Sequence, residues 1–117
     1  MNALFVERLL RAVPELMPIY QTHIRNNDEL LPYPFMGDAT RLVVAECGRL
    51  IDGQTQADLF IGSFLAVLET ELMAQDEEIS GLIALGFCEN LCGEPAAISI
   101  LKPRMGPLLA AKMKPFL

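Results

Sequence analysis

The sequence lacks basic residues over a long stretch. Between Ile51 and Leu101 no lysine or arginine occurs. The same stretch holds nine acidic residues: Asp52, Asp58, Glu69, Glu71, Asp76, Glu77, Glu78, Glu89 and Glu94. Because these acids alternate with the most apolar helical patterns of the chain, we expect them on exposed helix faces. One side of the protein should then carry a strong negative field.

The charge balance excludes one class of partner. With 9 basic and 15 acidic residues among 117, the formal net charge is −6. Nucleic-acid binding depends mainly on lysine and arginine side chains that neutralise phosphates, so we expect no direct binding to nucleic acid. A basic protein, or a basic groove on one, is the natural complement.

Tryptophan is absent, and cysteine and histidine are few. The odd count of three cysteines, Cys47, Cys88 and Cys92, argues against a disulfide framework and favours reduced thiols. Together with His23 they match the number of ligands in a Cys3His zinc site. Their spacing is not typical of structural zinc, so we expect no metal. His23 lies on an apolar helical stripe, which indicates a hydrogen-bonded, partly buried residue and not a catalytic base.

Motifs of catalysis and cofactor binding are missing as well. Gly81 and Gly86 have the spacing of a phosphate-binding loop, but Phe87 stands where lysine is required. The clustered carboxylates could suggest a glycosidase, yet such enzymes need a sugar cleft with aromatic walls, and this chain has no tryptophan. We therefore expect neither an enzyme nor a cofactor.

Long hydrophobic runs do not occur. The longest uncharged runs, Leu59–Leu68 and Ile79–Cys88, have 10 residues each, whereas a membrane-spanning helix needs roughly 20. Glu7, Arg8 and Arg11 interrupt the apolar core that an export signal would require. We expect a soluble, cytoplasmic protein without a membrane partner.

Apolar residues recur at helical spacing along nearly the whole chain, without useful period-two alternation. The strongest stripe predicts a central helix at about residues 56–74. Other patterns predict helices at about 2–13, from Leu16 to Ile24, from Asp38 to Ile51, and from Asp76 to Leu91, with short ones at 96–101 and 106–113. We expect an all-α fold in which residues 1–117 form a single domain, a compact bundle of about five to six helices.

Two prolines mark the segment between the second and third predicted helices. Pro32 and Pro34 disfavour regular helix and hold the residues before them extended. Residues 30–37 are therefore predicted to be a Pro-rich connector, and Asp38 the N-cap of the helix that follows. The connector is too apolar for an idle loop, through Leu31, Tyr33, Phe35 and Met36.

The last residues reverse the charge. The tail from residue 102 contains Lys102, Arg104, Lys112 and Lys114 and no acid. Two arrangements would bring this basic tail against acidic residues. The tail folds back on the acidic half of its own chain, or it lies against a second copy in a homodimer.

The segment from Asn26 to Asp38 reads NNDELLPYPFMGD. It resembles the connector of an uncharacterised family of small acidic bacterial all-helical proteins, which contains Leu-Leu-Pro and Phe-Met-Gly-Asp. Residues 14–16, 87–91 and 106–107 are similar to that family too. Several such families are suspected to be immunity proteins, which bind and silence a toxin made by the same cell. The resemblance implies no catalytic residues.

These observations predict an immunity-type protein that neutralises a cognate bacterial toxin, or another basic effector, through an acidic surface. The predicted partner-binding residues are Asp28, Glu29, Tyr33, Phe35 and Asp38 in and beside the connector, and Glu69, Glu71, Asp76, Glu77 and Glu78 on the later helices. Packing of Phe35 inside the protein is the competing interpretation for that residue. Two other functions stay open, a small regulatory or ligand-binding module and a homo-oligomeric structural protein.

Overall fold

The computed structural model describes residues 2–117, and all regular structure in this part is helical. The prediction of an all-α fold is confirmed, with more helices than the five to six expected. The seven α-helices are α1 (Ala3–Ala12), α2 (Met17–Asn27), α3 (Pro32–Ile51), α4 (Gln56–Met73), α5 (Glu77–Ile83), α6 (Pro95–Leu101) and α7 (Pro107–Met113). None of these helices is both long and apolar enough to cross a membrane.

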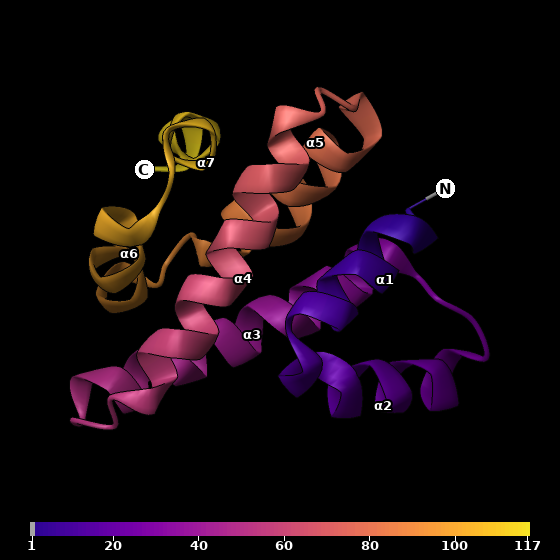
Figure 1. The fold of residues 1–117 in the computed structure, drawn as a ribbon, viewed down its shortest axis with the longest axis horizontal. Coiled ribbons are helices and arrows are strands. Elements are labelled where there is room, and N and C mark those ends of the chain that lie inside the picture. Colours follow the sequence, from indigo (N-terminus) through magenta and orange to yellow (C-terminus); the bar gives the residue numbers. More distant parts are fainter. Residues whose placement is uncertain (1) are drawn as a thin grey trace.

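Helix α4 is central, as its apolar stripe predicts. It crosses the molecule in front of α3, with α1 on one side and α6 and α7 on the other (Figure 1). Phe64 and Leu68 of α4 are fully buried, and the ring of Phe64 lies 5.5 Å from that of Phe87. Since burying one such side chain contributes about 1.5–3 kcal/mol, this stripe is a main source of stability.

The predicted connector is wrong, because α3 begins at Pro32 and runs to Ile51. The first N–H groups of a helix have no acceptor within that helix, so Pro32 and Pro34 in the first turn remove no hydrogen bond. Leu31 keeps the extended conformation that a residue before proline prefers (φ −110°, ψ 100°). Asp38 consequently lies inside the helix and is not its N-cap.

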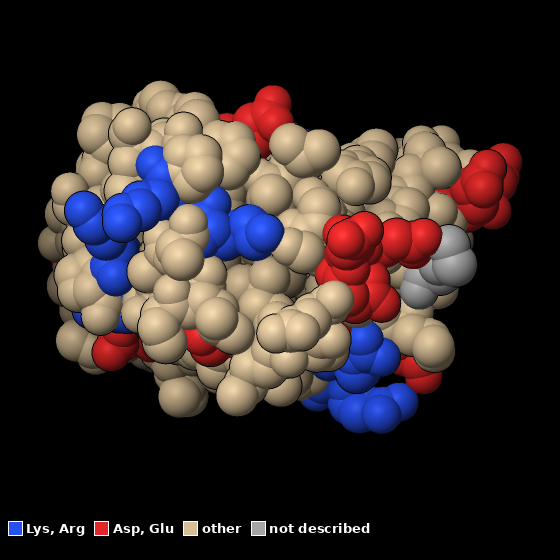
Figure 2. Space-filling view, turned by 90° about the horizontal axis from the view of Figure 1, so that it is seen from above, with Lys and Arg blue, Asp and Glu red and all other residues tan. Residues whose placement is uncertain are grey.

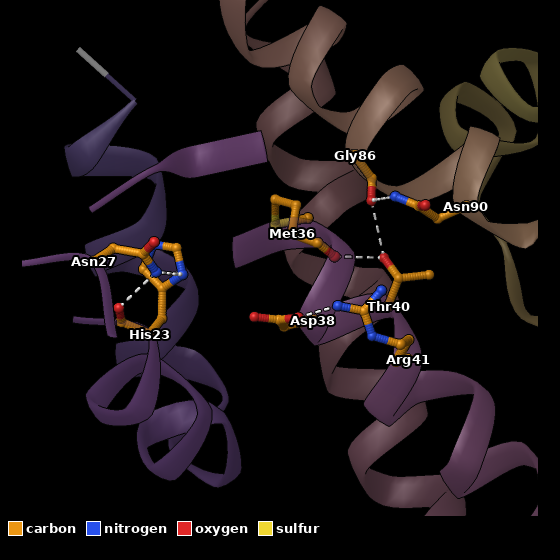
Figure 3. Close-up of polar contacts among 8 residues, drawn as sticks. All are labelled: His23, Asn27, Met36, Asp38, Thr40, Arg41, Gly86 and Asn90. Carbon is orange, nitrogen blue, oxygen red and sulfur yellow. Dashed lines mark hydrogen bonds and ion pairs between the residues drawn. The ribbon is translucent and has the colours of Figure 1, made fainter. Parts of the chain in front are cut away.

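His23 holds the turn between α2 and α3. Its ring Nε2 accepts a hydrogen bond from the backbone N–H of Leu31 at 2.9 Å. Asn27, which lies beside the ring in Figure 3, donates from Nδ2 to the carbonyl oxygen of His23 at 2.9 Å. His23 is buried, which confirms the prediction of a hydrogen-bonded residue with a structural role.

Helices α3 and α5 approach closely where α5 continues into a π-helical turn, Ala84–Cys88. The carbonyl oxygen of Gly86 accepts hydrogen bonds from Thr40 Oγ1 at 3.1 Å and from Asn90 Nδ2 at 2.8 Å (Figure 3). A Cβ atom on Gly86 would lie 2.7 Å from the Cβ of Met36. Glycine is therefore required here by the packing of two helix backbones.

We expect Gly86→Ala to lower the free energy of unfolding by about 1–3 kcal/mol, because the added methyl group overlaps Met36. Gly48→Ala is the matched control, since Gly48 also lies in a helix and a Cβ there meets nothing within 4 Å. That control should raise stability by about 0.4–1 kcal/mol. Urea unfolding monitored by circular dichroism measures both, and equal stability of the two variants would contradict the close approach.

Candidate partner-binding surface

Glu71 of α4 is buried, with 8% of its surface exposed. Its carboxylate accepts two hydrogen bonds from Arg8 of α1, at 2.6 Å from Nε and 2.7 Å from Nη2. The hydrogen bond to Glu71 raises the pKa of the Arg8 guanidinium, although burial opposes this shift. Contrary to the expectation that the acids all lie on exposed faces, Glu71 joins α1 to α4.

Glu69 of α4 also serves the fold. Its two carboxylate oxygens accept the backbone N–H groups of Leu108 and Leu109, each at 2.9 Å, and so cap the first turn of α7. A Cβ on Gly106 would lie 2.4 Å from Cδ of Glu69, so a larger residue there would displace this carboxyl group from the cap.

The basic tail folds back on its own chain. Nε of Arg104 lies 2.8 Å from Oδ1 of Asp58, in the first turn of α4. With the capping of α7 by Glu69, this contact confirms the first of the two arrangements expected for the tail.

Two further residues of the predicted surface have partners inside the molecule. Phe35 is fully buried, and its ring lies edge-on to Tyr20 at 5.9 Å and to His23 at 5.8 Å. Asp38 forms an ion pair with Arg41, one turn later in α3 (Figure 3). Phe35 presents no surface to a partner, and the charge of the partly exposed Asp38 is paired with Arg41, so we leave both out of the candidate surface.

The exposed acids gather at the start of α5. Asp76 caps this helix by accepting the N–H groups of Glu78 at 2.9 Å and Ile79 at 3.2 Å, which confirms that the acidic cluster begins a helix. Glu77 and Glu78 are exposed, and within residues 2–117 neither forms an ion pair. These two carboxylates are therefore accessible to an external partner.

Tyr33 connects this cluster with a second acidic group. Asp28 and Glu29 are exposed in the turn before α3, and Tyr33 follows with 45% of its surface exposed. The Tyr33 hydroxyl lies beside α5, at 3.6 Å from the position of a Cβ on Gly81. Glu77 and Glu78 lie one helical turn before Gly81, and hence near Tyr33.

We call this set of residues the acidic face. It consists of Asp28, Glu29, Tyr33, Asp76, Glu77 and Glu78. In Figure 2 one group of acidic atoms lies over the start of α5, and a separate group lies at the far right, over the turn between α2 and α3. Basic atoms gather over α6 and α7 at the left, and a second basic group lies directly below the acids of α5. Sequence reasoning missed the partners of the other acids, Arg8 above all. One signal was present: Glu71 follows Leu68 by three residues on the buried stripe of α4.

A shallow groove of about 430 Å³ lies between the acidic start of α5 and the basic helix α7. Asp76 and Glu77 lie on its α5 side and Lys112 on its α7 side, with Leu72 and Leu108 among the apolar lining. No three His, Cys, Asp or Glu side chains gather into a metal site in the part of the chain that the structure describes. Such a surface can bind a partner by charge and apolar contact.

Comparisons of the chain with protein-family models, with curated proteins and with solved structures find no match. The acidic face is therefore defined by the geometry and charge of its residues alone.

We expect Glu71→Ala to lower the free energy of unfolding by about 1.5–3 kcal/mol, because it removes charged hydrogen bonds from a buried site. The control is Glu7→Ala, which removes an exposed ion pair with Arg11 and should change stability by less than about 0.5 kcal/mol. Thermal and urea unfolding measure both. A small effect of Glu71→Ala would assign this carboxylate to the surface.

The three thiols should react differently. Burial raises the pKa of Cys47 to about 11 and that of Cys88 to about 12, whereas Cys92 is exposed. Since the thiolate is the reactive form, iodoacetamide at pH 8 should modify one cysteine of the folded protein, Cys92, and all three after unfolding. Mass spectrometry counts the modified residues, and Cys92→Ser should abolish labelling of the folded form. Rapid labelling of Cys47 or Cys88 in the native protein would contradict their burial.

Proposed function

We propose that the protein is an immunity-type inhibitor, which binds a basic effector protein such as a cognate bacterial toxin through the acidic face. One observation carries this proposal: within residues 2–117 the exposed carboxylates of Glu77 and Glu78 form no ion pair, and they lie one helical turn before Gly81, which the hydroxyl of the half-exposed Tyr33 approaches.

The charges of this face suit rapid and selective binding. A negative patch steers a basic partner toward it and repels acidic proteins. Glu77 and Glu78 break no ion pair with residues 2–117 when they bind, unlike Glu71, which would have to leave Arg8. The inhibitor therefore keeps its fold intact while it presents charge.

Tyr33 supplies the apolar part of the contact. Interfaces depend on a few aromatic or arginine anchors surrounded by weaker contacts. The Tyr33 ring is fixed at the start of α3 and lies against α5, so it loses little conformational freedom on binding. Its hydroxyl can also donate a hydrogen bond to a partner.

The test uses the product of the neighbouring gene, because an immunity protein and its toxin are made by the same cell. We expect this product to bind the protein, with an affinity that falls as salt rises. The double reversal Glu77→Lys and Glu78→Lys should weaken binding at least about tenfold for each charge, since close interfacial pairs contribute about 1.5 kcal/mol or more. Calorimetry measures the affinity, and toxin activity the neutralisation.

The matched control reverses Asp52 and Glu94 to lysine. Both are exposed acids outside the acidic face, so the net charge changes equally. The control should keep most of the affinity at moderate salt. Equal losses in the two double variants, or capture that is unaffected by reversing Glu77 and Glu78, would remove the acidic face from the interface.

A further inference from the structure

Within residues 2–117, four residues have the left-handed backbone conformation that favours glycine. Two of them are glycines, Gly53 (φ 92°) and Gly93 (φ 86°). The other two are Asp28, directly after α2 (φ 61°), and Gln75, between α4 and α5 (φ 57°). In this conformation a Cβ atom comes too close to the following carbonyl oxygen. The chain therefore accepts backbone strain at two helix ends where glycine, the usual residue, would relieve it.

The side chains of Asp28 and Gln75 do not serve the fold. Both residues are exposed, and within residues 2–117 neither side chain forms a hydrogen bond or an ion pair. Asp28 belongs to the acidic face, and Gln75 directly precedes Asp76 of that face. The two glycines lie in other turns, before α4 and before α6. Strain without benefit to the fold thus occurs at the proposed binding surface.

Gln75 also lines the groove between α5 and α7. Glu77 lies on the same side of the groove, and Leu72 and Leu108 contribute apolar lining. An amide oxygen and a carboxylate accept hydrogen bonds from a cation, whereas apolar lining covers an aliphatic stem. Arginine and lysine side chains combine such a stem with a cationic end. The groove therefore complements a long basic side chain in both charge and polarity.

We propose that this groove receives the basic side chain of an arginine or lysine of the partner protein, and that Gln75 is a further partner-binding residue. The inference rests on the proposed function, because it assigns a place to one cation of the basic partner. Lys112 on the α7 side of the groove repels a cation. The charged end of the bound side chain therefore lies toward Gln75 and Glu77, and its stem toward Leu108.

Two substitutions of Gln75 separate binding from strain. Gln75→Gly relieves the strained backbone, so it should raise the melting temperature by about 2–5 °C. It also removes the amide, so it should weaken binding of the neighbouring gene product about tenfold, the effect of one hydrogen bond to a charged group. Gln75→Ala removes the amide but keeps the strain. This variant should weaken binding equally without a rise in melting temperature.

The matched control is Gln54→Ala. Gln54 is an exposed glutamine in the turn before α4, at the opposite end of that helix, and it should leave the affinity unchanged. Calorimetry measures the affinity, and thermal unfolding the stability. Unchanged affinity of both Gln75 variants would overturn the role of this side chain. Weaker binding of Gln75→Gly alone would overturn it too, because the backbone of the turn would then be responsible.

Lys112 tests the charge of the occupant. Lys112→Met keeps an apolar stem and removes the cation that opposes a basic side chain in the groove. Lys102→Met is the control, since Lys102 is exposed outside the groove and the net charge changes equally. We expect Lys112→Met to strengthen binding of the neighbouring gene product roughly threefold more than Lys102→Met. Equal effects of the two substitutions, or weaker binding of Lys112→Met, would overturn the placement of a cation in this groove.

The neighbouring gene product also distinguishes the groove from the acidic face. If reversal of Glu77 and Glu78 weakens binding while the variants of Gln75 and Lys112 do not change it, the groove is outside the interface and the proposed function stands. If the product does not bind the wild-type chain at all, the proposed function is wrong and the groove has no such occupant.

Discussion

Helix α4 buries most of its apolar side chains, and α1, α3, α5 and α7 pack against it to cover them. A helix of this kind is stable in water only when it is surrounded. Helix α3 packs on its inner side, α1 and α7 pack along its edges, and α5 lies near its end. A short helix with little core of its own, such as α7, gains its stability from this contact, whereas the equally short α6 packs on α3. On the outer side of α4, Leu59 and Met73 stay exposed.

The acids of α4 explain how the covering elements are fixed in place. Asp58 binds Arg104 of the tail, Glu69 caps α7, and Glu71 binds Arg8 of α1. Each of the three acidic residues of α4 thus joins a different segment to the central helix. Apolar packing alone leaves the position of a helix along its neighbour poorly defined, whereas a hydrogen-bonded carboxylate accepts only one geometry. The acids that hold no other element in place, chiefly Glu77 and Glu78 at the start of α5, are the ones exposed to solvent.

The sequence is sufficient to predict the all-α class and most of the helices, because both depend on local signals. The apolar periodicity of α4 and the acidic cap at Asp76 are clear examples. Prediction from sequence fails where one local signal fits two structures, or where the partner of a residue lies far away in the chain. Pro32 and Pro34 suggest that no helix passes through them, yet they begin α3, because the N–H groups of a first helical turn have no acceptor within the helix. Glu71 reads as one more surface acid, although its place on the buried stripe of α4 requires a cation, and Arg8 lies 63 residues away. For the same reason, the sequence does not distinguish the exposed carboxylates of Glu77 and Glu78 from those of Glu69 and Glu71, whose partners within the chain only the fold reveals.

The fold decides which acids can act on a partner. Asp58, Glu69 and Glu71 of α4 are held by contacts within the chain, so binding through any of them would break a contact that positions another element. Glu77 and Glu78, at the start of α5, are exposed instead. Exposed carboxylates attract cations and repel another acidic chain, so the proposed contact suits a basic protein.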